Sequence, residues 1–268
     1  MSKQQNQSYS LQAPLISRTY GTGKVLVLLH GWGLNSGAWH SVIPEISKKY
    51  QVVTIDLPGF GENAANFPDE YSLSNLAHRV AALIPNNSVL LGWSMGGLIA
   101  QKIAIDNDIT LSGLITLAST PCFEQKADWH GIKPNVLRLF EQQLEQDYAQ
   151  TLSRFLAIQA LGSPSARADV KQLKQAISAY PTPAISALRS GLQLLSSVDL
   201  RCDIGEIDIP TLRMYGRLDS LVPVDGIERI HQLQPSAQQF LFQHAAHAPF
   251  ISHPHDWLNA IDTFISPL

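Results

Sequence analysis

The chain has 268 residues, of which 45% are hydrophobic and only 15% are charged. That length and composition predict a globular protein with a sizeable core and exclude an intrinsically disordered chain. With 19 basic and 22 acidic side chains the formal net charge is -3, which argues against a general nucleic-acid-binding protein. Two cysteines, Cys122 and Cys202, are too few for a secreted disulfide scaffold. Residues 1–12 lack the order of a signal peptide and no run reaches the length of a membrane helix, so we expect a cytoplasmic protein without membrane attachment.

Four short apolar runs in the first part of the chain have the character of strands buried on both faces, as in a parallel sheet. They cover residues 25–29, 52–55, 89–91 and 114–117. Helical patterns alternate with these runs at residues 39–49, 73–84 and 98–105, the second with Ser72 as its N-cap. Gly21-Thr22-Gly23, before the first run, is typical of a hairpin turn. The alternation predicts an α/β fold with a mostly parallel central sheet flanked by helices.

The alternation stops after Ser119 and resumes near Ile209. Residues 121–197 contain helical patterns interrupted by glycine and proline and no strand-like run. The later elements are a strand at 209–215, a helix at 224–234, a strand at 239–243 and a closing helix at 255–265. We therefore predict a core made of residues 1–120 and 198–268, with a helical cap of residues 121–197 inserted after the strand near 112–118.

Gly92-Trp93-Ser94-Met95-Gly96 is a G-x-S-x-G motif between a predicted strand and a predicted helix. In that context the serine sits on a strained turn, projects above the sheet and acts as a nucleophile. The start of the next helix offers backbone N–H donors to a developing oxyanion. The alternative is a glycine-rich turn without chemistry, but the strand–turn–helix context favours Ser94 as the nucleophile.

A serine nucleophile needs a general base, and His247 is the favoured candidate. It follows the last predicted strand within the small-residue loop 244–250, and ligand chemistry in open α/β sheets gathers at the carboxyl ends of strands. His244 is the competing candidate, although it is close enough to the strand to be structural. His253 and His255 flank Pro254 and have the character of helix-entry residues.

The acid that orients the histidine is predicted to be Asp219, at the end of the strand 209–215. The alternative role for this side chain is to cap the helix near Pro223. The loop His30-Gly31-Trp32-Gly33 follows the first long strand, where the second oxyanion donor arises in this arrangement. We predict an oxyanion hole from the backbone N–H groups of Trp32 and Met95, and interpret Asp56 as structural.

No phosphate-binding loop or dinucleotide fingerprint is present, and histidines and cysteines do not fall in metal-ligand spacing. We therefore expect neither a metal nor a cofactor. Cys122, beside Pro121 and Phe123, is predicted to be a buried structural thiol.

The chain resembles the α/β-hydrolase superfamily and, within it, the pimeloyl-[acyl-carrier protein] methyl ester esterases of biotin synthesis. The stretches that carry the resemblance are LLHGWGLNSGAWH (28–40), DLPGFG (56–61), LGWSMGGLIAQ (91–101), PCF (121–123), GIKP (131–134), RFLAIQ (154–159), YGRLDSLVP (215–223) and HAAHAPFISHP (244–254). GWGLN, RFLAIQ and AHAPFISHP are more specific than the triad motifs, which the whole superfamily shares. At Gly61-Glu62-Asn63 the sequence departs from these relatives, which often carry a basic residue and a serine there.

The resemblance implies a serine carboxylesterase that frees the pimeloyl carboxylate and methanol, with acyl-carrier protein as its partner. It implies a substrate site that includes Trp32, Ser94, Met95 and His247, with the stretch from Phe155 through Leu156, Ala157 and Ile158 to Gln159 along the acyl chain. We expect a monomer. The same triad would also serve a broad short-chain carboxylesterase or a C–C-bond hydrolase, and a non-catalytic binding protein of this fold is a further alternative.

Residues 148–190 contain five basic and one acidic side chain, a net charge of +4 on an otherwise acidic protein. Arg167, Lys171 and Lys174 are spaced to share one helical face, and Arg154 lies beside the predicted acyl-contacting stretch. A positive face attracts an acidic partner such as an acyl-carrier protein. An equally simple interpretation is a solvated helix face.

Overall fold

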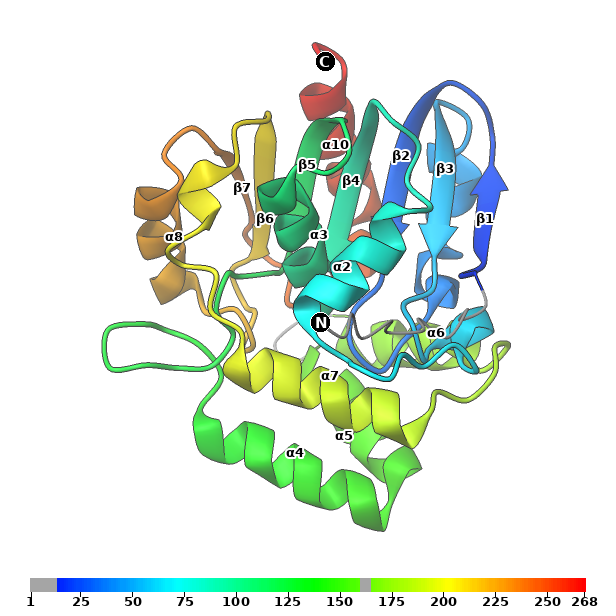
Figure 1. Cartoon of the computed structure of the whole chain (residues 1–268), viewed down its shortest axis with the longest axis vertical. Helices are drawn as coiled ribbons and strands as arrows, with labels where there is room; N and C mark the ends of the chain where they lie inside the picture. The colour runs from blue at the N-terminus through cyan, green and yellow to red at the C-terminus, as the bar shows by residue number, and fades with distance from the viewer. Residues whose placement is uncertain (1–13, 160–164) are drawn as a thin grey trace, which may run out of the picture.

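The computed structural model describes residues 14–159 and 165–268 (Figure 1), so the predicted absence of a signal peptide concerns residues outside the described part. A seven-stranded sheet has the order β1-β3-β2-β4-β5-β6-β7, with β1 antiparallel to β3 and all other pairs parallel. The strands are β1 (Ser17–Tyr20), β2 (Lys24–Leu29), β3 (Tyr50–Ile55), β4 (Ser88–Trp93), β5 (Leu111–Leu117), β6 (Thr211–Gly216) and β7 (Gln238–Phe242). This confirms the predicted α/β class with a mostly parallel sheet.

The predicted hairpin at residues 21–23 is wrong. β2 pairs with β3 on one side and β4 on the other, so β1 does not pair with β2 and joins the sheet at the outer edge of β3. The turn still requires glycine, because Gly21 has a φ of +70° and a Cβ there would lie 2.2 Å from the carbonyl oxygen of Ser47. The glycines predicted a turn, but they did not indicate with which strand β1 would pair.

Helices cover both faces of the sheet. They are α1 (Ile43–Ile46), α2 (Leu73–Ala81), α3 (Met95–Asp106), α8 (Ile227–Leu233), α9 (Pro249–Ser252) and α10 (Pro254–Ile265). The Ser72 hydroxyl accepts a hydrogen bond from the Asn75 amide, as its predicted capping role requires. A single helix over residues 39–49 is wrong, because a 3-10 turn at Ser36–Trp39 is followed by the separate α1, which has Pro44 in its first turn.

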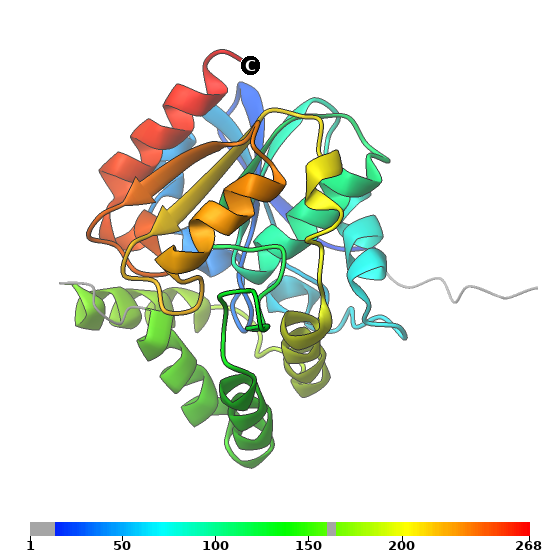
Figure 2. The ribbon, with the colours of Figure 1, turned by 90° about the vertical axis from the view of Figure 1, so that its left-hand side faces the viewer.

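The core lies in two layers, one on each face of the sheet. In Figure 2, α2, α3 and α8 lie on one face and α10 lies on the other. Alternate residues of β2 divide between them: Val27 and Leu29 pack on the first side, and Leu26 and Leu28 on the second. Burial on both sides explains why this strand is a continuous apolar run.

Between β5 and β6 the described residues form the α-helices α4 (Pro134–Gln146), α5 (Tyr148–Gln159), α6 (Ala166–Ile177) and α7 (Ile185–Ser197). They lie below the sheet in Figure 1, at the end where the parallel strands finish. The described part of residues 121–197 contains isolated bridges of Glu124 with Ile132 and of Lys126 with Trp129, but no extended strand. Of the described helices, none is long and apolar enough to cross a membrane.

Candidate active site

Ser94 sits on a sharp turn between β4 and α3. Its φ of +56° and ψ of −120° are unusual for a residue with a side chain, and such backbone strain gathers at functional sites. The turn needs glycine on both sides of it. A Cβ on Gly92 would lie 2.3 Å from the carbonyl oxygen of Gly96, and one on Gly96 would lie 2.5 Å from that of His30. The local sequence thus folds into the turn that the G-x-S-x-G motif predicted.

The backbone around Ser94 is held on both sides. Its N–H donates to the carbonyl of Leu117 at 2.9 Å, and its own carbonyl accepts from the Ser119 hydroxyl at 2.8 Å. Ser94 is 3% exposed. The end of β5 therefore fixes the position of the candidate nucleophile.

Asp219 and His247 are brought together from the end of β6 and the loop after β7. His247 Nδ1 lies 2.7 Å from Asp219 Oδ2, and both residues are buried. The other carboxylate oxygen accepts from the amides of Leu221 and Val222, at 2.8 and 3.1 Å. Since an ionised carboxylate only accepts hydrogen bonds, Nδ1 carries the proton and Nε2 presents a lone pair.

The opposite ring nitrogen of His247 is available for chemistry. Nε2 is buried and has no hydrogen-bond partner within the described residues. The indole N–H of Trp93, next to Ser94, donates to the carbonyl of His247 at 2.8 Å, which ties the histidine loop to the serine turn. Candidate bases often bond their nucleophile loosely before substrate binds. By contrast, His244 and His255 are exposed and His253 is half-buried.

The predicted oxyanion residues Trp32 and Met95 are both fully buried. Gly31 brings their two segments close, because a Cβ on it would lie 3.2 Å from the Ser94 Cβ. Helix α7 packs on both side chains at Gly191, where a Cβ would lie 2.6 Å from Trp32 Cδ1 and 3.2 Å from Met95 Sδ. This contact with α7 holds Trp32 and Met95 in place. In the sequence, only a glycine within a helical run indicated a close approach at this position.

His30 and Asp56 hold the loops beside this site. His30 Nδ1 donates to the Gly31 carbonyl at 2.8 Å and Nε2 accepts from the Leu57 amide at 3.0 Å. Burial lowers the pKa of His30 despite the nearby Asp56 carboxylate, so the ring is neutral. Asp56 accepts from the amides of Ser36 and Glu62, which agrees with a structural role.

The unusual Glu62-Asn63 pair also has a structural explanation. Glu62 forms a two-pronged ion pair with Arg18 of β1, at 2.8 and 2.5 Å. The Asn63 side chain bonds the backbone N–H and carbonyl of Ile16 and the carbonyl of Asp56. Both residues therefore fasten the chain entering β1 to the loop after β3.

The predicted acyl-contacting stretch lies in α5. Phe155 is buried, with its ring centroid 4.6 Å from that of Trp32, and Leu156 is buried as well. Ala157 is exposed, and the side chains of Ile158 and Gln159 lie outside the described part. Of the side chains in this stretch that the structure describes, Phe155 and Leu156 thus lie in the interior.

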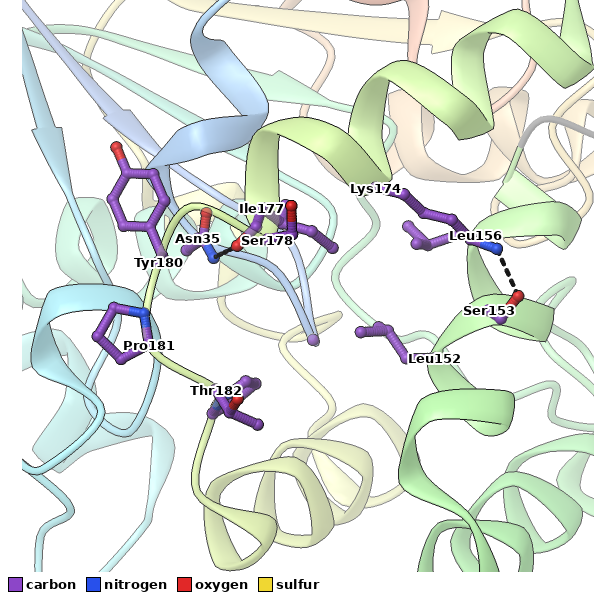
Figure 3. A pocket seen from close by; sticks show the side chains of 12 residues that line it. Asn35, Leu152, Ser153, Leu156, Lys174, Ile177, Ser178, Tyr180, Pro181 and Thr182 are labelled. Carbon is purple, nitrogen blue, oxygen red and sulfur yellow. Dashed lines mark hydrogen bonds between the residues drawn. The ribbon is translucent and has the colours of Figure 1, made fainter.

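A pocket of about 310 Å³ opens between α5, α6 and residues 180–183 (Figure 3). Leu152 and Leu156 line it on the α5 side, and Gly33 lies against Leu152. Its polar groups include Lys174, which donates to Ser153 at 2.6 Å, and Tyr180, whose pKa burial raises to about 12. One of the lining residues, Gly33, directly follows Trp32 in the chain. No local sequence pattern predicts this pocket, because residues 180–183 indicate only a break between helices, at Pro181 and Pro183.

The predicted carrier-protein face is exposed. Arg167, Lys171 and Lys174 lie on α6 and Arg154 on α5, all four exposed. Leu173 is buried and Val170 and Ile177 are half-buried on the neighbouring stripe of α6. The described residues contain no group of three or more histidine, cysteine or acidic side chains that could hold a metal ion. Cys122 is buried as predicted, and burial raises its pKa.

Comparison with known proteins places this arrangement among hydrolases. Residues 24–254 match the family model described as the alpha/beta hydrolase fold. A protein of Aeromonas hydrophila is 47% identical over 92% of this chain and 97% of its own length, and one of Pseudoalteromonas atlantica is 46% identical over 92% and 96%. Both are named pimeloyl-[acyl-carrier protein] methyl ester esterase. An esterase structure from Exiguobacterium antarcticum superposes with a TM-score of 0.82 at 22% identity, over 94% of this chain and 95% of that one, which supports the fold.

Proposed function

This chain belongs to the α/β-hydrolase family and is a carboxylic ester hydrolase, and from that premise we propose that it hydrolyses the methyl ester of pimeloyl-[acyl-carrier protein]. The products are methanol and the free pimeloyl carboxylate still attached to its carrier, a step of biotin synthesis. The observation that carries the proposal is the 47% identity to a relative of that name, along nearly the whole chain.

The proposed acylation uses Ser94, His247 and Asp219. Ser94 Oγ attacks the ester carbonyl while His247 Nε2 takes its proton, and Asp219 stabilises the imidazolium through Nδ1–H. The N–H groups of Trp32 and Met95 bind the oxyanion. When the tetrahedral intermediate collapses, the bond to the methoxy oxygen breaks and His247 returns the proton to release methanol.

Deacylation repeats the same proton transfers with water as nucleophile. His247 Nε2 takes a proton from water, the hydroxide attacks the Ser94 ester, and the proton passes to Ser94 Oγ as it leaves. The buried, unpartnered Nε2 and its fixed tautomer support this role. None of these steps uses a metal or a cofactor.

We place the acyl chain between the core and the helices α4–α7, which serve as the cap in this proposal. Phe155 supplies apolar surface next to Trp32, and Leu156 lines the pocket beside Gly33. The acidic carrier protein would dock on the exposed face made of Arg154, Arg167, Lys171 and Lys174. The expectations of a cytoplasmic monomer with no nucleic-acid or membrane partner belong to the same proposal.

A genetic complementation tests the function. The gene should restore growth without biotin to a strain that lacks its pimeloyl-carrier methyl esterase, and the Ser94→Ala gene should not. Purified protein should hydrolyse the carrier-bound methyl ester with a higher kcat/KM than p-nitrophenyl butyrate. Failure of complementation together with efficient cleavage of small esters would indicate the broad carboxylesterase instead.

A further inference from the structure

A charged side chain of β6 lies buried beneath the helices α3 and α8 and has no part in the proposed reaction. Arg213 of β6 is 0% exposed. Its guanidinium donates hydrogen bonds to two neutral side chains, Gln101 of α3 and Gln234 just after α8. Burying a guanidinium is costly unless hydrogen bonds compensate for the lost water, so its retention calls for a reason.

The first of these glutamines connects Arg213 to the serine turn. Arg213 Nη1 donates to Gln101 Oε1 at 3.0 Å. A guanidinium has no acceptor, so this bond fixes which end of the amide faces the arginine and turns Nε2 the other way. Gln101 Nε2 donates to the carbonyls of Gly97 and Thr120, at 3.1 and 3.4 Å.

Those two carbonyls belong to the segments that hold Ser94 in place. The Gly97 amide donates to the Ser94 carbonyl at 2.9 Å within the first turn of α3. Ser119, which precedes Thr120, donates its hydroxyl to the same carbonyl at 2.8 Å. Gln101 therefore joins the two segments that bond Ser94, and it does so in an orientation set by Arg213.

The second glutamine bonds Arg213 in the same manner but serves another part of the fold. Gln234 Oε1 accepts from Arg213 Nε and Nη2, at 3.1 and 2.5 Å. Its Nε2 donates to the Thr211 hydroxyl and the Ile207 carbonyl, at 3.1 and 3.4 Å, where the chain enters β6. Gln234 is thus a matched partner of Arg213 that bonds neither of the segments holding Ser94.

We propose that Arg213 and Gln101 are positioning residues for Ser94: the arginine orients the amide of Gln101, and that amide joins the first turn of α3 to the end of β5. The inference rests on the proposed role of Ser94 as nucleophile. It adds Arg213 and Gln101 to the residues that determine the rate of ester hydrolysis. Neither residue contacts the reacting atoms.

Two matched substitutions test it, Gln101→Glu and Gln234→Glu. Each gives Arg213 a carboxylate partner, and each removes one pair of amide N–H donors. Gln101→Glu should lower kcat for p-nitrophenyl butyrate about ten- to a hundred-fold, because small displacements of a reacting group are costly. Its KM and Tm should stay close to the parent values. Gln234→Glu should retain the parent kcat and KM.

The inference is overturned if Gln101→Glu keeps the parent kcat, or if both variants lose kcat to the same extent. If Gln101→Glu does not fold, Gln101→Met takes its place with the same expected kcat loss, and failure of both to fold would assign Gln101 to the fold alone. A parallel assay of Ser94→Ala distinguishes failure of this inference from failure of the proposed function. Parent-like activity there would refute the proposed function itself, and the inference with it.

Discussion

The imidazole Nδ1 of His247 lies 2.7 Å from Oδ2 of Asp219, and each side chain is only 1% exposed. The second oxygen of the carboxylate is occupied by the amides of Leu221 and Val222. The carboxylate therefore cannot rotate without breaking three hydrogen bonds. A buried pair of this kind selects one tautomer of the histidine, and that tautomer leaves Nε2 able to accept a proton.

Ser94→Ala should abolish ester hydrolysis while the protein stays folded. Loss of the nucleophile removes the covalent route and lowers kcat by on the order of a thousand-fold or more. The measurement is p-nitrophenyl butyrate hydrolysis, with Tm from circular dichroism as the check on folding. Ser197→Ala, at an exposed position of α7, is the matched control. A purified Ser94→Ala protein with near-normal rates would disprove the assignment.

His247→Ala should lower kcat far more than His244→Ala. The two residues belong to the same loop, but His247 is buried against Asp219 whereas His244 is exposed. Removal of the base leaves Ser94 without a proton acceptor. Steady-state kinetics of the two variants decide the matter, and the reverse ranking would make His244 the base.

Asp219→Asn should lower kcat by roughly ten-thousand-fold with little change in KM. The amides of Leu221 and Val222 require an oxygen, so the asparagine would turn its NH₂ group toward His247 Nδ1. The imidazole must then carry its proton on Nε2 and can no longer act as a base. Asp225→Asn, at an exposed position, is the control and should keep parent activity. Equal activity of both variants would leave Asp219 with a capping role only.

Reversal of charge on α6 should separate carrier-protein binding from chemistry. Arg167→Glu combined with Lys171→Glu should raise KM for a carrier-bound methyl ester, because charges at the rim of an interface mainly affect association. The loss should be largest at low salt, where screening is weak. The same variant should hydrolyse p-nitrophenyl butyrate at the parent rate.

The control for this experiment is a charge reversal elsewhere on the surface. Arg229→Glu changes an exposed arginine of α8 and should leave both substrates unaffected. If the α6 variant slows both substrates equally, these residues support the fold of the cap. If it slows neither, the face is only solvated surface.

The free energy of unfolding should fall as the pH drops below about 6.5. Burial holds the pKa of His30 below its ordinary value, so the unfolded chain takes up a proton there before the folded chain does. His30 thus favours the folded state above its unfolded pKa, and that contribution is lost as pH falls toward the folded pKa. Urea unfolding at pH 7.5, 6.5 and 5.5 measures the slope, which should be shallower in His30→Gln. His78→Gln, on the exposed side of α2, is the control, and an equal change there would show another source.

The sequence alone determined the elements whose signals are local. Continuous apolar runs predicted β2, β3, β4 and β5, because strands buried on both faces need apolar residues at every position. Ser94, Asp219 and His247 were each predicted from a loop that follows a strand. The carboxyl ends of parallel strands meet at one edge of the sheet, so these loops were expected to lie together. The glycines of the serine turn were predictable because a Cβ would collide with neighbouring backbone.

Tertiary structure decided what depends on contacts between distant residues. β1 joined the sheet beside β3 rather than β2, since β2 was already paired on both sides. Gly191 of α7 packs against Trp32 and Met95, and no local sequence pattern predicts this contact between distant segments. Arg213 is an isolated charge inside a predicted strand, and only the tertiary structure shows its partners, Gln101 of α3 and Gln234 just after α8. Local sequence patterns predict the secondary structure that a residue favours, whereas the packing of the sheet and helices determines which distant residues it contacts.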